Sequence, residues 1–532
     1  MIKTLVVDNF KGTMTAFQDG DINSGFAYVT NVFGYNPFPK PGNLTWCDTP
    51  EQVNPDEDVI TDLIMAGKER VESGILYVYA IGHTGRLYKI QVNDLGTFNP
   101  DYDNAVLLTT LVSGSPTFTR GGFIDFFGAT ERIYIGHDKG VTRVDFNGGN
   151  ETAIAGTWTQ TVPRPLKQFI GKLYIGNGEN IAEIDSTATV TSSAKLSPGF
   201  PSGTQVRDMD VTPDGNYLQI VSTTLTLGNI TVGTQDTSIT SNSNSFIFKW
   251  NGTDTGYTAF DTFPSYSLTA NTIFGPYQYT FGYDQFGAAV YNPTNKLLTL
   301  QEVQSASPNA IASSGNLLCF MAPLHFGGFM ETDFFWYGSL DFEVGPGYWD
   351  LLSAFPTSPE TDIVQTPFMM PVSNFGIGTS SNGYTDNIYG NSKFYFSTLE
   401  TSSGPTTAYR LYKWSLQTSP SVSSGVPQVD ALYQTQSQIF SKKVTIKEVR
   451  VYGEPWVAGV SFKIDLIGSA GTAITNGSKT FTAGTNLTIG DDFAWYTPDP
   501  APTYAIGLGI TNKGEVNHVI TKVEIDYTTG GK

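Results

Sequence analysis

The chain has 532 residues, of which only 15% are charged and 13% are aromatic, and it contains 56 Gly and 29 Pro. Few charges and many turn-forming residues exclude a mainly helical protein and favour many short strands joined by turns. Acidic residues outnumber basic ones by 49 to 30, for a formal net charge of −19. Because binding nucleic acid requires Lys and Arg against the phosphates, we expect no specific binding of DNA or RNA.

The first twenty residues, MIKTLVVDNFKGTMTAFQDG, carry no signal-peptide pattern. Their apolar run, TLVV, is too short for the hydrophobic region of a signal peptide, and no cleavage site of small residues follows it. No stretch of the chain approaches the ~18 apolar residues that a membrane-spanning helix requires. We therefore expect a protein that is made in the cytoplasm without a secretion signal and that has no membrane segment.

Residues 31–46, NVFGYNPFPKPGNLTW, combine three prolines and four aromatic residues with a single charged residue. The prolines exclude a helix, and the aromatic residues argue against a disordered tail. We expect residues 1–58 to form a short N-terminal strand, KTLVVDNF, followed by an ordered, extended arm rich in Pro and aromatic residues.

Three stretches after this arm share one pattern. Each has an apolar run, a turn of about four residues that contains Gly, and a run in which apolar and polar residues alternate. The three stretches are ILYVYAIGHTGRLYKIQV (75–92), ERIYIGHDKGVTRVDFNG (131–148) and GKLYIGNGENIAEIDS (171–186). This pattern predicts β-hairpins.

Looser versions of the pattern follow and predict further paired strands. They span 211–224, 245–252, 287–301, 315–323, 333–344, 392–399 and 408–417. A four-stranded unit that recurs every ~40–50 residues is typical of β-propeller blades. We therefore expect residues 59–420 to form a β-propeller of six or seven blades, because radial stacking buries the sheet faces and shortens the exposed edges.

One of these stretches, VTPDGNYLQIV (211–221), resembles the turn-and-strand signature of TolB-like and YVTN-type propellers. Asp214 and Gly215 occupy the turn, and Tyr217 begins the strand. The resemblance implies a propeller strand at this point. Asp214 also has a simpler interpretation, in which its carboxylate accepts hydrogen bonds from its own turn.

The composition changes after the last of these stretches. Residues 421–438 are rich in Ser, Pro and Gln and are predicted to be a linker. Residues 439–532 contain strongly alternating runs, which predict an antiparallel β-sandwich or jelly roll. The first and last strands of this domain are both long, and we expect them to pair. The predicted fold is therefore all-β, a propeller followed by a sandwich.

No residue pattern predicts a catalytic, cofactor-binding or metal site. The four histidines are His83, His137, His325 and His518. They lie far apart in the sequence, so we expect no zinc site, and we interpret each as a turn or surface residue. The chain contains neither the nucleophile elbow of hydrolases nor a phosphate-binding loop.

The carboxylates and cysteines do not predict a specific site either. The acidic clusters at 56–58, 101–103 and 491–492 fit solvated loops or, alternatively, calcium ligands. A glycosidase pair of carboxylates is also compatible with the composition. Cys47 and Cys319 are too few for a disulfide framework, and whether they lie close together is left open.

The start of the chain resembles the N-terminal segments of bacteriophage tail proteins built on propellers. These are the nozzle or tail-tube proteins of short-tailed phages and the related tail-hub stabilisation proteins. The likeness extends to Trp46 and includes Asn31, Gly34 and the run Lys40-Pro41-Gly42, with Pro39-Lys40-Pro41 in place of the family's usual Arg-Pro. The strands within 442–469 and 518–531 resemble the accessory sandwich domains of phage structural proteins, a likeness carried by residues 447–449 and 522–527.

The resemblance gives the Pro/aromatic arm a role. Pro keeps the arm extended and lowers the entropy cost of ordering it. The aromatic side chains would anchor it on the propeller or on a neighbouring subunit. These candidate inter-subunit anchors are Phe33, Tyr35, Phe38 and Trp46. The alternative is an ordinary loop packed on its own propeller.

The resemblance implies a non-enzymatic structural protein of the virion, a component of the phage tail. Copies of the chain would form a ring that extends the DNA channel, binds neighbouring tail proteins or fibres, and lets DNA pass without specific binding. Its acidic charge suits such a channel, because like charges repel DNA. Two alternatives stay open. One is a propeller protein that binds or hydrolyses glycans, and the other is a head-decoration or receptor-binding protein.

Overall fold

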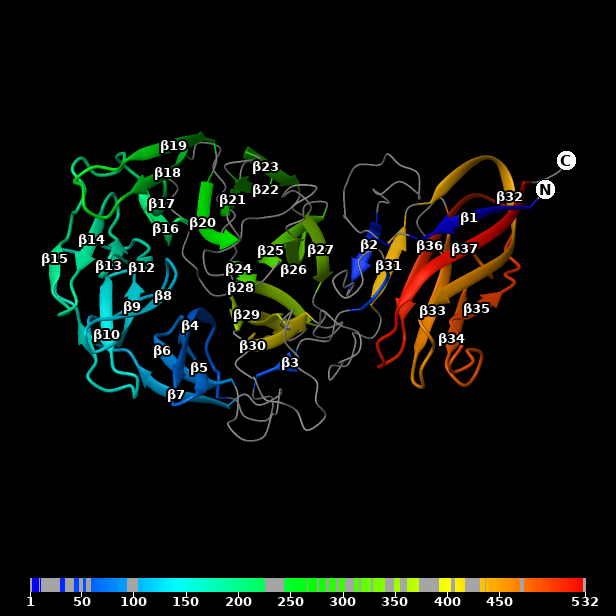
Figure 1. The fold of residues 1–532 in the computed structure, drawn as a ribbon, viewed down its shortest axis with the longest axis horizontal. Coiled ribbons are helices and arrows are strands. Elements are labelled where there is room, and N and C mark those ends of the chain that lie inside the picture. The colour runs from blue at the N-terminus through cyan, green and yellow to red at the C-terminus, as the bar shows by residue number, and fades with distance from the viewer. Residues whose placement is uncertain are drawn as a thin grey trace.

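The structure is a computed structural model. It describes residues 2–8, 10, 29–33, 43–46, 51–53, 59–92, 104–224, 244–265, 267–274, 277–283, 287–292, 296–301, 311–314, 317–326, 329–339, 349–354, 361–372, 392–402, 407–416, 431–435, 437–468 and 473–529. These residues form 37 strands and no helix, so the predicted all-β class is confirmed. Figure 1 shows two units along the long axis, a propeller and a sheet made largely by the C-terminal part of the chain.

Seven four-stranded antiparallel sheets make up the described part of the propeller. Blades 1 and 2 consist of β4 (Ile64–Glu72), β5 (Ile75–Gly82), β6 (Arg86–Gln91) and β7 (Asn104–Thr110), then β8 (Phe123–Phe127), β9 (Arg132–His137), β10 (Gly140–Val144) and β11 (Thr152–Ala153). Blades 3 and 4 consist of β12 (Leu166–Phe169), β13 (Lys172–Gly176), β14 (Ile181–Ile184) and β15 (Val190–Ser192), then β16 (Gln205–Val211), β17 (Leu218–Thr223), β18 (Asn244–Trp250) and β19 (Ala259–Pro264).

The remaining blades follow the same order. Blades 5 and 6 consist of β20 (Ser267–Phe274), β21 (Tyr277–Tyr283), β22 (Gly287–Asn292) and β23 (Lys296–Gln301), then β24 (Ile311–Ser314), β25 (Leu317–Phe326), β26 (Phe329–Ser339) and β27 (Trp349–Ala354). Blade 7 consists of β28 (Thr361–Val372), β29 (Ser392–Ser402), β30 (Thr407–Leu416) and β3 (Glu51–Gln52). Blade 7 thus takes its fourth strand from the N-terminal part of the chain.

The blades form a closed ring. The first strands of successive blades contact one another in the cycle β4, β8, β12, β16, β20, β24, β28 and back to β4, so they are the innermost strands. The ring is closed by β3, in which Glu51 pairs with Lys413 and Gln52 pairs with Tyr412 of β30. A propeller is confirmed, and its blade number lies within the predicted range of six or seven.

The core lies in layers between neighbouring blades. Val78 and Ile90 of blade 1, both fully buried, pack with Phe368 and Tyr395 of blade 7. Similar layers join blades 1 and 2, 2 and 3, and 3 and 4. The three predicted hairpins supply these layers, because alternate residues on each strand face the next blade.

The second unit is one nine-stranded sheet that curls into two layers. Its strands are β1 (Ile2–Val7), β2 (Val29–Phe33), β31 (Leu432–Thr435), β32 (Gln438–Gly453), β33 (Ser461–Ile467), β34 (Lys479–Thr482), β35 (Phe493–Tyr496), β36 (Thr503–Asn512) and β37 (Ile520–Thr529). The long strand β32 pairs first with β36 and then, from Val444, with β37, so it passes from one layer to the other. Side chains from both layers share one core, as predicted for a sandwich. The predicted pairing of the long first and last strands is observed between β32 and β37.

The N-terminal segment belongs to both units. β1 pairs along its whole length with the C-terminal strand β37, from Ile2 with Thr528 to Val7 with Val523. Leu44 then exchanges backbone hydrogen bonds with Ile520 at 2.8 and 2.9 Å. Figure 1 accordingly shows the two chain ends together on the sheet, far from the propeller.

Two of the predicted segments contain strands of the folded units. Residues 1–58 were expected to form an N-terminal strand and an extended arm, and their described strands belong to the C-terminal sheet and to blade 7. The predicted linker, 421–438, contains β31 and the first residue of β32. Cys47 lies outside the described residues, and of Cys319 only the backbone pairing with Ala312 and Tyr337 is described.

Candidate functional site

Trp46 is the predicted anchor whose side chain the structure describes. It is 1% exposed and lies in the core of the C-terminal sheet. Its indole N–H donates a hydrogen bond to Nε2 of His518 at 3.2 Å. Trp46 therefore holds the N-terminal segment on the C-terminal sheet of its own chain. This differs from the predicted role, because a fully buried ring has no surface left for the propeller or another subunit.

The other predicted anchors are described less fully. Phe33 is the last residue of β2, where its backbone pairs with Leu432. Tyr35 and Phe38 lie outside the described residues. β2 also lies against β27, so this part of the segment is close to blade 6. An inter-subunit role for Phe33, Tyr35 and Phe38 stays a prediction.

A cavity of about 650 Å³ opens between blades 1 and 2. Its lining residues are Arg70, Val71, Glu72, Ser73, Lys89, Leu108, Phe146 and Asn147. They come from the end of β4 and the following turn, from β6 and β7, and from the loop after β10. Ser73 and Gly74 both have positive φ, 52° and 85°, which is the backbone of a tight two-residue hairpin turn.

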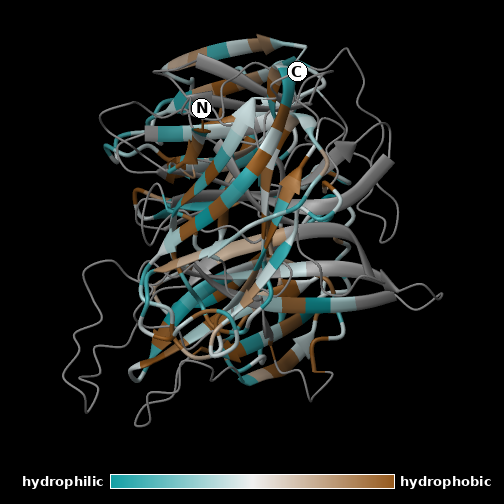
Figure 2. Ribbon diagram, turned by 90° about the vertical axis from the view of Figure 1, so that its right-hand side faces the viewer, coloured by the Kyte–Doolittle hydropathy of each residue, from teal (hydrophilic) through white to brown (hydrophobic). Residues whose placement is uncertain are grey.

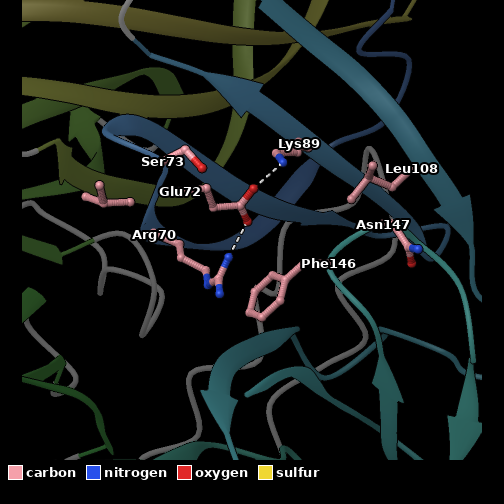
Figure 3. Close-up of a pocket in the computed structure, with 8 residues that line it drawn as sticks. Arg70, Glu72, Ser73, Lys89, Leu108, Phe146 and Asn147 are labelled. Atoms are coloured by element: carbon pink, nitrogen blue, oxygen red, sulfur yellow. Dashed lines mark hydrogen bonds and ion pairs between the residues drawn. The ribbon is translucent and has the colours of Figure 1, made fainter. Parts of the chain in front are cut away.

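Glu72 is the centre of this cavity. Its carboxylate accepts hydrogen bonds from Lys89 Nζ at 2.6 Å, from the Tyr79 hydroxyl at 2.5 Å and from the Arg70 guanidinium at 2.5 Å. Figure 3 shows Arg70 and Lys89 approaching this carboxylate from two sides. Arg70 also donates from Nε to Glu131 at 2.9 Å. The two cations and two carboxylates therefore neutralise one another.

Aromatic rings hold the cations in place. The Arg70 guanidinium lies 3.7 Å from the centroid of the Phe146 ring, which belongs to blade 2. Lys89 Nζ lies 3.9 Å from the centroid of Tyr77. The Tyr79 ring packs edge-on against Phe146 with 5.2 Å between centroids. Such cation–π and edge-to-face contacts each contribute on the order of 0.5–1.5 kcal/mol.

The hydrogen bonds in the cavity favour the charged form of Glu72. Burial alone would raise the pKa of Glu72, but the hydrogen bonds from Lys89, Tyr79 and Arg70 outweigh it and lower that pKa. Burial and the bond to Glu72 raise the pKa of Tyr79 far above its usual value. A general acid or base works best when its pKa lies near the working pH. This network therefore suits the joining of two blades or the holding of a polar ligand better than proton transfer.

Charged side chains also join the innermost strands of blades 1 to 3. Lys68 of β4 forms an ion pair with Asp125 of β8. The other carboxylate oxygen of Asp125 accepts a hydrogen bond from the backbone N–H of Gln168 in β12 at 3.2 Å. One carboxylate thus connects three consecutive blades.

The same arrangement recurs around blades 3 to 5. Lys167 of β12 pairs with Asp210 of β16 at 2.5 Å. Asp208 accepts a hydrogen bond from the backbone N–H of Asn271 in β20 at 2.6 Å. Burial raises the pKa of Asp208 to about 8, against the effect of the Asn271 hydrogen bond. Each acidic group here binds a donor on a neighbouring blade, so these residues stabilise the ring.

His83 lies in a turn, as the sequence interpretation expected, whereas His137 and His518 differ from it. His83 forms an ion-pair contact with Asp62 beside its turn. His137 and His518 are only 2% and 6% exposed, so neither is a surface residue. Burial lowers the pKa of each to about 4, so both are neutral at pH 7. The prediction of a turn or surface position is wrong for His518, because its ring packs in the core.

Within the described residues, no group of three or more His, Cys, Asp or Glu side chains is placed to hold a metal ion. The same part of the chain contains no helix that could cross a membrane. Asp491 and Asp492, one of the predicted acidic clusters, use their backbone carbonyls to accept hydrogen bonds from Trp456 and Gly453.

The chain matches no protein-family model and no curated protein sequence. The solved structures to which it is similar include β-propellers. A chain of the mitotic checkpoint complex is 12% identical over 73% of this chain and 98% of its own, with a TM-score of 0.38. The β-propeller domain of Cps50 (Swd1) from Myceliophteria thermophila is 9% identical over 69% and 100%, also with a TM-score of 0.38. An exo-β-1,3-galactanase from Phanerochaete chrysosporium is 9% identical over 90% and 100%, with a TM-score of 0.28. None of these similarities bears on what this chain binds.

Sequence reasoning missed both charged networks. Arg70, Glu72 and Lys89 lie on β4 and β6, and Phe146 follows β10 of the next blade. The alternation of Lys68, Arg70 and Glu72 along one strand was the available signal, because alternate residues on a strand share a face. The partners Asp125 and Glu131 come from another blade, and the hairpin pattern alone does not give that pairing.

Proposed function

We propose that the protein is a structural component of a bacteriophage tail, a nozzle or tube-ring protein. Copies of it assemble into a ring that extends the DNA channel and binds neighbouring tail proteins or fibres. DNA passes through this ring without specific binding. The proposal places the protein in the virion and assigns it no catalytic activity. Its sequence support is the resemblance of the segment up to Trp46 to the N-terminal segments of such tail proteins.

The observation that carries the proposal is the path of the N-terminal segment. β1 pairs with β37, Trp46 lies in the core of the C-terminal sheet, and β3 completes blade 7. The chain therefore connects the two units twice, once before blade 1 and once between β30 and β31. Two covalent connections resist separation of the units under force, which suits a part that transmits load within a particle.

The charged networks give further support. In the cavity, Glu72 is saturated by three donors, and on the innermost strands Asp125 and Asp210 bind cations of a neighbouring blade. Removing one partner of such a network costs more than the pair contributes, because a buried charge is left alone. These paired charges stabilise the arrangement of the blades, as a structural protein requires.

The experiment is a mass measurement by light scattering on the purified chain. The proposal expects a complex of six or twelve copies of the 57.8 kDa chain. A trimer would favour the receptor-binding alternative. A monomer that cleaves polysaccharides would favour the glycan-hydrolysing alternative, and either result would overturn the tail-ring proposal.

A further inference from the structure

The outer side of the C-terminal sheet carries an ordered array of aromatic and charged side chains, which we call the aromatic face. It is formed by β35, β32 and β37. Its members are Glu448, Arg450, Tyr452, Phe493, Trp495, Lys522, Glu524 and Asp526. Figure 2 views this side of the molecule and shows hydrophilic and hydrophobic bands alternating along the strands.

Two aromatic residues of this face are exposed to solvent and do not contribute to the core of the sheet. Trp495 is 56% exposed and Phe493 is 37% exposed. Between and beside them on β35, Ala494 and Tyr496 point inward and are buried. Phe493 and Trp495 therefore occupy the solvent side of an edge strand, where polar residues are usual. Because these two exposed rings lie side by side on one strand, they are not scattered singly and form a small apolar patch.

The neighbouring strand extends the aromatic surface. Tyr452 lies opposite Phe493 with 5.1 Å between ring centroids, and Arg450 lies opposite Trp495. Lys522 Nζ lies 4.1 Å from the Tyr452 centroid. The rings and the long side chains thus form a continuous surface across three strands.

The charges of the aromatic face are already paired within it. Arg450 binds Asp526 at 2.9 Å and Glu524 at 3.1 Å. Lys522 binds Glu524 at 2.9 Å, and the Tyr452 hydroxyl donates to Glu524 at 3.0 Å. These contacts fix the side chains in place and leave little local field to attract a polyanion or a polycation.

We propose that the aromatic face binds a neutral glycan. The faces of sugar rings carry C–H groups, which are attracted to the negative faces of Trp495 and Phe493. The fixed guanidinium and carboxylate groups of Arg450 and Glu524 can donate to and accept from sugar hydroxyls. Glycan binding is a further function that does not depend on the tail-ring proposal.

Area and charge favour this ligand over other partners. Two aromatic rings that are 56% and 37% exposed offer on the order of 200 Å² of apolar surface. A stable protein interface needs ~800 Å² on each side, of which ~56% is apolar. The chain's net charge of −19 repels anionic polymers over longer distances. An uncharged polyhydroxylated chain is complementary to this surface in both respects.

The test is native gel electrophoresis of the full chain in gels containing dextran, mannan, galactan or starch, with alginate as the anionic comparison. We expect at least one neutral polysaccharide to retard the wild-type chain and Trp495→Ala to weaken that binding at least tenfold. Phe260→Ala is the matched control, because Phe260 is a 54% exposed aromatic residue on blade 4. It should bind like the wild type.

Three results would overturn the proposal. They are no retardation by any neutral polysaccharide, equal binding by Trp495→Ala and wild type, and retardation by alginate alone. A Trp495→Ala chain that binds normally but changes its oligomeric mass would identify the face as a protein interface. Thermal unfolding of each variant shows whether it is folded, and Phe493→Ala provides a second substitution on the same face.

Discussion

The indole N–H of Trp46 donates to Nε2 of His518, a residue 472 positions later in the chain. Because Nε2 accepts this bond, the proton of the neutral imidazole resides on Nδ1, which faces the Val516 carbonyl at 3.3 Å. The imidazole also stacks on Phe462 with 5.3 Å between centroids. Both ring nitrogens are thus satisfied in the neutral form, and the N-terminal segment is attached to the C-terminal sheet through this contact.

Because His518 is neutral in the folded protein, the free energy of unfolding should depend on pH. Burial lowers its pKa in the folded protein to about 4 from the ordinary 6.5. The unfolded chain then binds more protons between these values, so the stabilisation is full above pH 6.5 and is lost as pH falls toward 4. The loss is about 1.4 kcal/mol per pH unit and about 3 kcal/mol in total.

Urea unfolding at several pH values measures this loss. The His518→Gln variant should be less stable than the wild type at pH 7, and its stability should fall less steeply from pH 6.5 to 4. The second buried histidine, His137, is present in both proteins, so its contribution cancels. Identical slopes for the two proteins would show that His518 does not titrate as described.

The buried side chain of Trp46 should contribute strongly to the stability of the fold. Trp46→Ala removes a fully buried ring and leaves a cavity and an unpaired His518, so we expect a loss of about 3–5 kcal/mol. Hydrogen exchange should accelerate at Leu44 and Ile520, whose backbone groups bond to each other. The matched control is Trp495→Ala, which truncates a half-exposed Trp of the same sheet. Equal effects of the two substitutions would contradict the assigned core position.

The closure of the propeller can be tested at Val53. Its backbone N–H donates to the Leu411 carbonyl at 2.8 Å, and its side chain is 3% exposed between blades 1 and 7. Val53→Ala should destabilise the propeller by about 2 kcal/mol, because two buried methyl groups are lost. Val112→Ala, at a position that is 74% exposed, should change stability by less than about 0.5 kcal/mol. Thermal unfolding measures both, and an unaffected Val53→Ala chain would argue against closure by this segment.

The cavity between blades 1 and 2 offers a matched pair of carboxylates. Glu72→Gln keeps the shape but removes the charge that binds Arg70 and Lys89, so we expect a loss of about 1–3 kcal/mol. Glu131→Gln alters a carboxylate that is 49% exposed and that, within the described part of the chain, forms an ion pair with Arg70. Its cost should stay below about 1 kcal/mol. Denaturant midpoints measure the difference, and a larger effect of Glu131→Gln would reverse the assignment of Glu72 as the centre.

The local parts of the fold could be predicted from the sequence. The hairpin predicted at 131–148 is present and pairs Tyr134 with Arg143, and the strands predicted at 211–224 and 245–252 pair with each other, Leu218 with Trp250. Asp214 accepts hydrogen bonds from Thr212 and Asn216 of its own turn, the simpler of its two interpretations. Such contacts lie within a few tens of residues, where turn chemistry and periodicity determine the register.

The long-range parts could not be predicted. The pairing of Ile2 with Thr528 and the contact of Trp46 with His518 join distant parts of the chain, and the pattern of one strand does not identify its distant partner. β3 has only two residues, too few for any periodicity. The Pro/aromatic composition of 31–46 does not identify the core of the C-terminal sheet as the place that receives Trp46.

The most direct test of the structural role is electron microscopy of the purified full-length chain at micromolar concentration. Our account predicts closed rings of identical copies, with a propeller in each copy and a central opening wide enough for duplex DNA. Isolated two-lobed particles at every concentration tested, without rings, would contradict it.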